Sequence, residues 1–165
     1  MPILTVAGSI SDPNFQEARL IAEDVVTHDS LLRLHIVGLV PSEWEAYLEN
    51  LRKHPTLIST AFNHPVDQPF VSHNNEGYIG TTTDLIAWSK KRYGMSDPRN
   101  EKKTYGALQS RFVSVAERKL VAYMRSNSDK NTYVYMDFAL PDTQEKRRVI
   151  FELYSHVCPK AVENI

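Results

Sequence analysis

The residue types that most often carry out chemistry are few in this sequence, and they are not spaced as the common sites require. Cys158 is the only cysteine, which excludes an intrachain disulfide, a Cys-x-x-Cys redox pair and a zinc finger. None of the six histidines has another histidine four residues away, the spacing of a metal site on a helix. No serine lies in a nucleophile-elbow sequence, so a Ser/His/Asp triad is not indicated. We therefore expect neither a metal nor a cofactor.

Helix starts are the remaining places where the sequence could bind a ligand. Thr82, Thr83 and Asp84 are expected to open a helix, and the free backbone N–H groups there could bind a carboxylate. Ordinary capping of a helix explains the same residues more simply. Asp12, which precedes Pro13, is likewise expected to be a helix cap and not a catalytic acid. The sequence GYIGTTTD is a poor phosphate loop because it lacks the Gly-Lys-Ser/Thr ending.

Length and composition indicate a globular protein of one domain, or of one domain with a small extra unit. The chain has 165 residues, of which 42% are hydrophobic and 24% are charged. No apolar run approaches the ~20 residues that cross a bilayer. The start MPILTVAG lacks the basic and apolar regions of a signal peptide. We therefore expect a cytoplasmic protein that does not enter a membrane.

The net charge of −1 hides an uneven distribution along the chain. Residues 1–89 carry a net charge of −7, residues 90–130 carry +7 and residues 131–165 carry −1. A basic segment could meet nucleic acid or an acidic partner, or it could neutralise the acidic segment before it. No aromatic residues interleave with the basic cluster as base stacking would require. We therefore favour neutralisation within the chain and do not expect nucleic-acid binding.

The first half of the sequence predicts alternating strands and helices. The strands are predicted from apolar β-forming runs, and the helices from apolar residues at helical spacing. A capping box of Ser42 and Glu45 marks one helix start, and Gly94 marks one helix end. The predicted strands are 2–8, 31–40, 69–73 and 78–80, the predicted helices are 13–28, 42–54 and 81–94, and 54–68 is a predicted loop. Two parallel strands joined by a helix, followed by a hairpin and a helix, predict a small mixed α/β sheet with helices on both faces.

The second half of the sequence predicts helix first and then a hairpin. Apolar residues at helical spacing from Tyr105 to Tyr123 predict one long helix, or two helices with a break near Gly106. The polar stretch 126–131 is the candidate domain boundary. The predicted helix covers about 101–125, the predicted strands are 132–140 and 147–154 with a turn at 141–144, and the final residues predict the first turn of a helix.

Residues 2–94 resemble a glutaredoxin, the smallest form of the thioredoxin fold, in the order of their elements and in several short motifs. The stretch Asp12-Pro13-Asn14-Phe15 lies where glutaredoxins have Cys-Pro-aromatic-Cys. Gln68-Pro69-Phe70-Val71 matches the Val-Pro before the third strand, whose proline is cis in that family. The remaining matches are the turn 74–77, the pair Ile79-Gly80 and the helix start Thr82-Thr83-Asp84-Leu85. The resemblance implies a domain over 1–94, followed by a helical connector over 95–131.

This resemblance implies a groove but not the redox chemistry of the family. A thiolate is the attacking group in disulfide exchange, and the two thiol positions resemble Asp12 and Phe15 here. In glutaredoxins, part of glutathione lies between the first helix start, the proline before the third strand and the later helix start. The resemblance therefore implies a vestigial groove that could hold a protein partner. Its residues would be Asp12, Phe15, Pro69, Thr82, Thr83 and Asp84.

Residues 132–165 are similar to the start of a cyclophilin domain. The stretches VYMDFA and RVIFELY resemble the first two strands of that family, and VCPKAVENI resembles the start of its first helix. Phe-Glu-Leu, Pro-Lys and Glu-Asn keep the relative spacing of the family, whereas the turn is one residue longer and Arg147 replaces a usual glycine. Cyclophilins are peptidyl-prolyl cis-trans isomerases built on a closed eight-stranded barrel.

The second resemblance implies that residues 132–165 are a truncated, amino-terminal part of such a barrel. The catalytic arginine and the proline pocket of the family come after the first helix, so no residue here has a catalytic role by correspondence. A lone hairpin is marginal in water and would expose apolar side chains on unpaired edges. Those side chains are Tyr133, Tyr135, Phe138, Ile150, Phe151 and Tyr154. We therefore expect the front part of a longer protein whose barrel would meet proline-containing peptides.

Three functions stay open from the sequence alone. The longer protein could be a prolyl isomerase with a front domain that positions substrates, or a pseudoenzyme whose catalytic arginine is replaced. Alternatively, the chain could work alone as a non-catalytic thioredoxin-fold binding module, through the groove near Pro69 or the basic helix at 101–125. Sequence beyond Ile165 with an aromatic and arginine pocket would favour the first function.

Overall fold

The computed structural model describes residues 1–53, 64–100, 102–139 and 146–164. These residues form two compact units, residues 1–120 and residues 121–165. Most of the predicted loop at 54–68 and the whole predicted turn at 141–144 lie outside the described residues. The division of the chain into segments 1–94, 95–131 and 132–165 stays a prediction.

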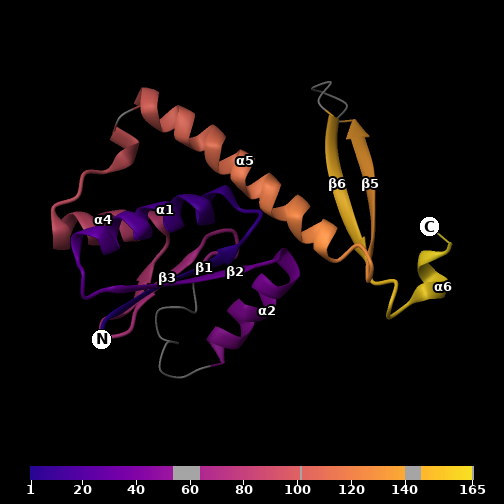
Figure 1. Ribbon diagram of the computed structural model, residues 1–165, viewed down its shortest axis with the longest axis horizontal. Helices are drawn as coiled ribbons and strands as arrows, with labels where there is room; N and C mark the ends of the chain where they lie inside the picture. Colours follow the sequence, from indigo (N-terminus) through magenta and orange to yellow (C-terminus); the bar gives the residue numbers. More distant parts are fainter. Residues whose placement is uncertain (54–63, 101, 140–145, 165) are drawn as a thin grey trace. The chain divides into compact units, whose positions relative to one another are not determined.

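The first unit contains a four-stranded mixed sheet with the strand order β2-β1-β3-β4 (Figure 1). The central strand β1 (Ile3–Ser9) runs parallel to β2 (Arg33–Leu39). On its other side β1 runs antiparallel to β3 (Phe70–His73), which pairs antiparallel with β4 (Gly77–Gly80). The predicted mixed α/β sheet is therefore confirmed, with boundaries within two residues of those expected.

Helices cover both faces of this sheet (Figure 1). The helices α1 (Pro13–His28) and α4 (Thr82–Tyr93) pack on one face, and α2 (Pro41–Arg52) packs on the other. The first face buries Leu4, Val6, Phe15, Ala18, Ile21, Ala22, Val25, Leu32, Val71, Leu85 and Ile86. The second face buries Ala7, Trp44, Leu48 and Phe70. Flanking helices on both faces are also as the sequence predicts.

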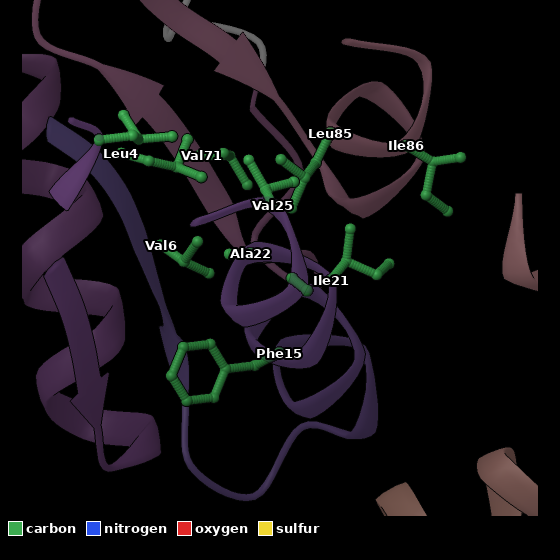
Figure 2. Packing of buried hydrophobic residues seen from close by; sticks show 11 residues of the cluster. Leu4, Val6, Phe15, Ile21, Ala22, Val25, Val71, Leu85 and Ile86 are labelled. Carbon is green, nitrogen blue, oxygen red and sulfur yellow. The ribbon is translucent and has the colours of Figure 1, made fainter. Parts of the chain in front are cut away.

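Phe15 is the only aromatic residue among the buried members of the first cluster. Figure 2 shows its ring extending from the start of α1 toward β1. The ring lies over Gly8, where an added Cβ would come within 2.6 Å of the Phe15 ring atom Cδ2. Gly8 is paired with Gly38 of β2, whose added Cβ would lie 3.5 Å from the same ring. Two glycines side by side therefore leave the space into which the phenyl ring packs.

Two helix starts follow capping rules, one of them differently from the prediction. Asp12 caps α1 as expected, because its Oδ1 accepts a hydrogen bond of 2.9 Å from the N–H of Asn14. The predicted cap of α2 at Ser42 is wrong. The helix begins at Pro41, whose fixed φ suits the first helical position, and the N–H of Val40 donates to Oε2 of Glu43 over 3.4 Å. The capping acid is therefore Glu43 and not Glu45.

A short connection leads from α4 to a long helix. Gly94 ends α4 with a φ of +68°, a left-handed conformation that glycine adopts without strain. A 3-10 turn at Pro98–Asn100 follows, and then α5 (Lys102–Ser126). Because α5 is continuous through Gly106, the alternative of one long helix holds. None of the described helices is both long and apolar enough to span a membrane.

The second unit contains a hairpin and a short helix. The strands β5 (Thr132–Ala139) and β6 (Lys146–Leu153) pair antiparallel, and α6 (Pro159–Val162) follows them. Residues directly opposite one another in such a pair share a face, and successive residues alternate between faces. The register therefore places on one face Val134, Met136, Phe138, Val149, Phe151 and Leu153. We call this set the apolar hairpin face.

The opposite face of the hairpin carries the charged residues Asp137, Arg148 and Glu152 together with Ile150, and its polar groups bond to one another. Arg148 makes a bidentate pair with Asp137 at 2.7 and 2.8 Å, and its guanidinium lies 4.0 Å from the centre of the Tyr135 ring. Tyr133 is half-buried and donates to Oε1 of Glu152 over 2.8 Å, which corrects the expectation that it is exposed. Burial of the hydroxyl, reinforced by the Glu152 carboxylate, raises the pKa of Tyr133 to about 12.

Candidate functional site

The structure brings together the two helix starts of the predicted groove. The hydroxyl of Thr82, at the start of α4, donates to the carbonyl of Asn14, at the start of α1, over 3.2 Å. However, Phe15, Pro69 and Thr82 are buried, and Phe15 and Thr82 expose only 2% and 1% of their surface. These three residues are therefore packed inside the fold at the helix starts and offer almost no surface to a ligand.

The exposed polar groups of the predicted groove are already bonded within the chain. Oδ2 of Asp84 accepts from the N–H and the hydroxyl of Thr81, at 2.8 and 2.9 Å. The hydroxyl of Thr83 accepts a hydrogen bond of 3.0 Å from Arg99. The Asp12 carboxylate caps α1, and burial raises its pKa. These contacts agree with capping as the role of both helix starts.

The glutaredoxin resemblance also meets a backbone difference at Pro69. The structure contains no cis peptide bond among the described residues, so the bond between Gln68 and Pro69 is trans. The two thiol positions hold a carboxylate cap and a buried phenyl ring. The residues at these positions therefore cannot perform thiol–disulfide exchange.

A buried ion pair lies next to these helix starts, and the sequence did not reveal it. Glu17 of α1 is 3% exposed, and its carboxylate receives two hydrogen bonds of 3.1 Å from Nε and Nη2 of Arg99. The hydroxyl of Tyr105 on α5 donates to the same carboxylate over 3.0 Å. Through its Nη1, Arg99 also reaches Thr83 of α4. One carboxylate therefore ties together α1, α4, the 3-10 turn and α5.

We call the hydrogen-bonded group of Glu17, Arg99 and Tyr105 the clamp, because its electrostatics suit a structural role. Hydrogen bonding to Glu17 raises the pKa of Arg99, and burial together with the Glu17 carboxylate raises the pKa of Tyr105. Both neighbours therefore keep their protons at any physiological pH, and neither changes its protonation state beside the carboxylate. Such an arrangement fixes the position of α5 but offers no group for proton transfer.

His64 forms a second buried polar centre, beside β4. Its ring is 4% exposed, with Nδ1 2.6 Å from the Tyr78 hydroxyl and Nε2 2.9 Å from the carbonyl oxygen of Gln68. A carbonyl only accepts, so Nε2 carries the proton and Nδ1 accepts from Tyr78. Burial lowers the pKa of His64, so the neutral ring is the stable form in the folded chain. Among the described residues, no group of three acidic, histidine or cysteine side chains is placed to hold a metal ion.

Comparison with known proteins gives two relatives and no family model that matches the chain. The first relative is a human protein named "probable inactive peptidyl-prolyl cis-trans isomerase-like 6", 29% identical over 96% of this chain. The second is the mouse protein of the same name, 26% identical over 98% of this chain. The chain spans about half the length of these curated relatives, 47% of each. The two matches support a relationship to a cyclophilin-like family.

Removing the guanidinium of Arg99 should destabilise the first unit. The variant Arg99→Ala leaves the buried Glu17 carboxylate with Tyr105 as its remaining donor, and losing one partner of a buried pair costs about 3 kcal/mol. The matched control is Lys53→Ala, which breaks a pair with Glu49 whose side chains are 66% and 67% exposed and which should cost less than about 1 kcal/mol. Urea unfolding followed by tryptophan fluorescence measures both losses. Equal small losses would contradict the clamp.

The low pKa of His64 should make the first unit less stable in mild acid. As the pH falls below 6.5, the unfolded chain binds a proton at this ring before the folded chain does, so stability falls with a slope of at most about 1.4 kcal/mol per pH unit. The stability is fully present above pH 6.5 and is lost between that value and the lowered pKa of the folded state. Urea unfolding at several pH values measures the slope. The slope should become smaller in His64→Gln. It should stay the same in the control His35→Gln, because His35 is exposed. An unchanged slope in His64→Gln would count against a lowered pKa of His64 as its cause.

Proposed function

We propose that this chain is the amino-terminal part of a longer cyclophilin-like protein that binds proline-containing segments without catalysing their isomerisation. In this proposal, residues 132–165 supply the first two strands of the barrel and the start of its first helix. Residues 1–94 form a glutaredoxin-like domain without active-site cysteines, and residues 95–131 connect the two. The observation that carries the proposal is the apolar hairpin face.

The apolar hairpin face has the pattern of a strand pair with one side meant for a core. Its members Met136, Phe138 and Val149 are 51%, 47% and 41% exposed in this chain. The opposite side holds the ion pair of Asp137 and Arg148 and is suited to water. A two-stranded hairpin is marginally stable by itself, and a closed barrel both buries such a face and removes its open edges. Further strands of a barrel are therefore the occupant that we propose for this face.

The absence of catalysis is proposed on two grounds. None of the described residues corresponds to the catalytic arginine or the proline pocket of cyclophilins, which follow the first helix in that family. In addition, both relatives carry the words "probable inactive" in their names. Among the three functions that the sequence left open, the pseudoenzyme is therefore the one we propose.

The glutaredoxin-like assignment of residues 1–94 has support of its own. The strand order β2-β1-β3-β4, with β1 and β2 parallel and β3 and β4 antiparallel to their neighbours, agrees with the element order of that family. The contact between Thr82 and Asn14 brings the two helix starts together, as the resemblance implies. The trans bond before Pro69 and the buried groove residues argue for a scaffold whose ligand site is lost. A protein partner, rather than glutathione, is the ligand class that we propose for this domain.

The native protein tests the proposal through its mass and its activity. An antibody against residues 1–125 should recover a protein from its cell with an intact mass well above the 18.9 kDa of this chain. That protein should bind a proline-containing peptide, as measured by calorimetry, and leave the rate of prolyl isomerisation at its uncatalysed value, tens of seconds or longer. An active cyclophilin provides the control. A native mass equal to that of this chain would refute the barrel, and catalysed isomerisation would refute the pseudoenzyme.

A further inference from the structure

A cavity with no role in the proposed function lies on the α1 side of the first unit. Its volume is about 510 Å³, and it opens between α1, the end of α4, the connection after α4 and the first half of α5. Its apolar lining consists of Leu20, Ile21, Met95, Pro98, Leu108 and Phe112. Sites for small molecules commonly have volumes of about 300–1,000 Å³ and a mainly apolar lining. The cavity therefore has the size and surface of a small-molecule site.

The clamp around Glu17 joins α1 to α5 at the edge of this cavity. Glu17 and Tyr105 line this cavity and also a second one of about 290 Å³, so their hydrogen-bonded pair lies between the two spaces. At this point polar contacts, and not interlocking apolar side chains, join the two helices. As a result Leu20, which faces the cavity from α1, remains 40% exposed. The hydrogen-bonded pair of Glu17 and Tyr105 therefore forms a fixed part of the cavity wall.

The charged side chains among the described lining residues are all acidic. The carboxylates of Glu17, Glu23 and Asp24 line it, and no lysine or arginine is among the described lining residues. Arg99 neutralises Glu17, and Arg19 lies 3.3 Å from Glu23. Within the described part of the chain, the Asp24 carboxylate has neither a hydrogen bond nor an ion pair, although the backbone oxygen of Asp24 accepts from Thr27. Among the side chains that the structure describes, the exposed Asp24 carboxylate is therefore an unpaired negative charge at the edge of an apolar space.

We propose that this cavity binds a small hydrophobic amine. The apolar body of the ligand packs on Leu20, Ile21 and Phe112, and its ammonium group pairs with Asp24. A neutral ligand of the same shape gains the apolar contacts alone, and a carboxylate meets a wall of like charge. This site belongs to the first unit and does not depend on the barrel of the proposed function.

Three probes that share one apolar body test the charge preference. The chain, labelled at its methyl groups, is titrated with adamantyl ammonium, adamantanol or adamantane carboxylate and followed by NMR. We expect saturable shifts at the methyl groups of Leu20, Ile21 and Leu108. The ammonium should bind about two- to five-fold more tightly than the alcohol, the range of partly exposed ion pairs, and the carboxylate should bind most weakly.

Variants separate the contribution of charge from that of shape. The variant Asp24→Asn should abolish the advantage of the ammonium over the alcohol, whereas the control Glu45→Gln, an exposed carboxylate on α2, should keep it. Leu20→Trp fills the cavity from an exposed position and should weaken the ammonium and the alcohol at least about tenfold, or 1.4 kcal/mol. The proposal is overturned if no probe gives saturable shifts at these methyl groups, if the carboxylate binds as tightly as the ammonium, or if Asp24→Asn leaves the preference unchanged.

Discussion

The central strand β1 must be buried on both of its faces, and the first unit is organised around this requirement. Leu4 and Val6 point into the cluster under α1 and α4, while Ala7 belongs to the cluster under α2. The Phe15 ring can approach β1 closely because glycines occupy both adjacent strands beneath it. Each of these helices therefore has an apolar surface to cover.

The hairpin of the second unit follows the same physical rule with a different result. Its register places six apolar residues on one face and Asp137, Arg148 and Glu152, together with Ile150, on the other, yet Met136, Phe138, Val149 and Phe151 of the apolar hairpin face are exposed in this chain. Burying a side chain such as methionine or phenylalanine stabilises a fold by about 1.5–3 kcal/mol, so six such residues are a strong reason for further strands to pack there. The longer protein that we propose would account for this difference between the two units.

Local rules predicted local structure, and they failed where distant residues meet. The cap at Asp12, the end of α4 at Gly94 and the single helix through Gly106 follow from neighbouring residue types. The start of α2 was misplaced because Pro41 and Ser42 are both acceptable openings, and the backbone at Val40 decides between them. Glu17 and Arg99 are 82 positions apart, so no local pattern could pair them. The groove itself stays a prediction; the structure joins the two helix starts through Thr82 and Asn14, and the burial of Phe15 and Thr82 depends on packing that the sequence does not display.

The most direct test of the account compares two matched substitutions on opposite faces of the hairpin in the native protein. Met136→Gln places an amide on the apolar hairpin face, and Tyr135→Gln places one on the opposite face, where it also removes the ring contact with Arg148; both residues are more than half exposed in this chain, at 51% and 61%. If further strands cover the first face, as we propose, thermal unfolding of the native protein should show a loss of about 2 kcal/mol for Met136→Gln and less than about 1 kcal/mol for Tyr135→Gln. Equal small effects of the two substitutions would contradict the account.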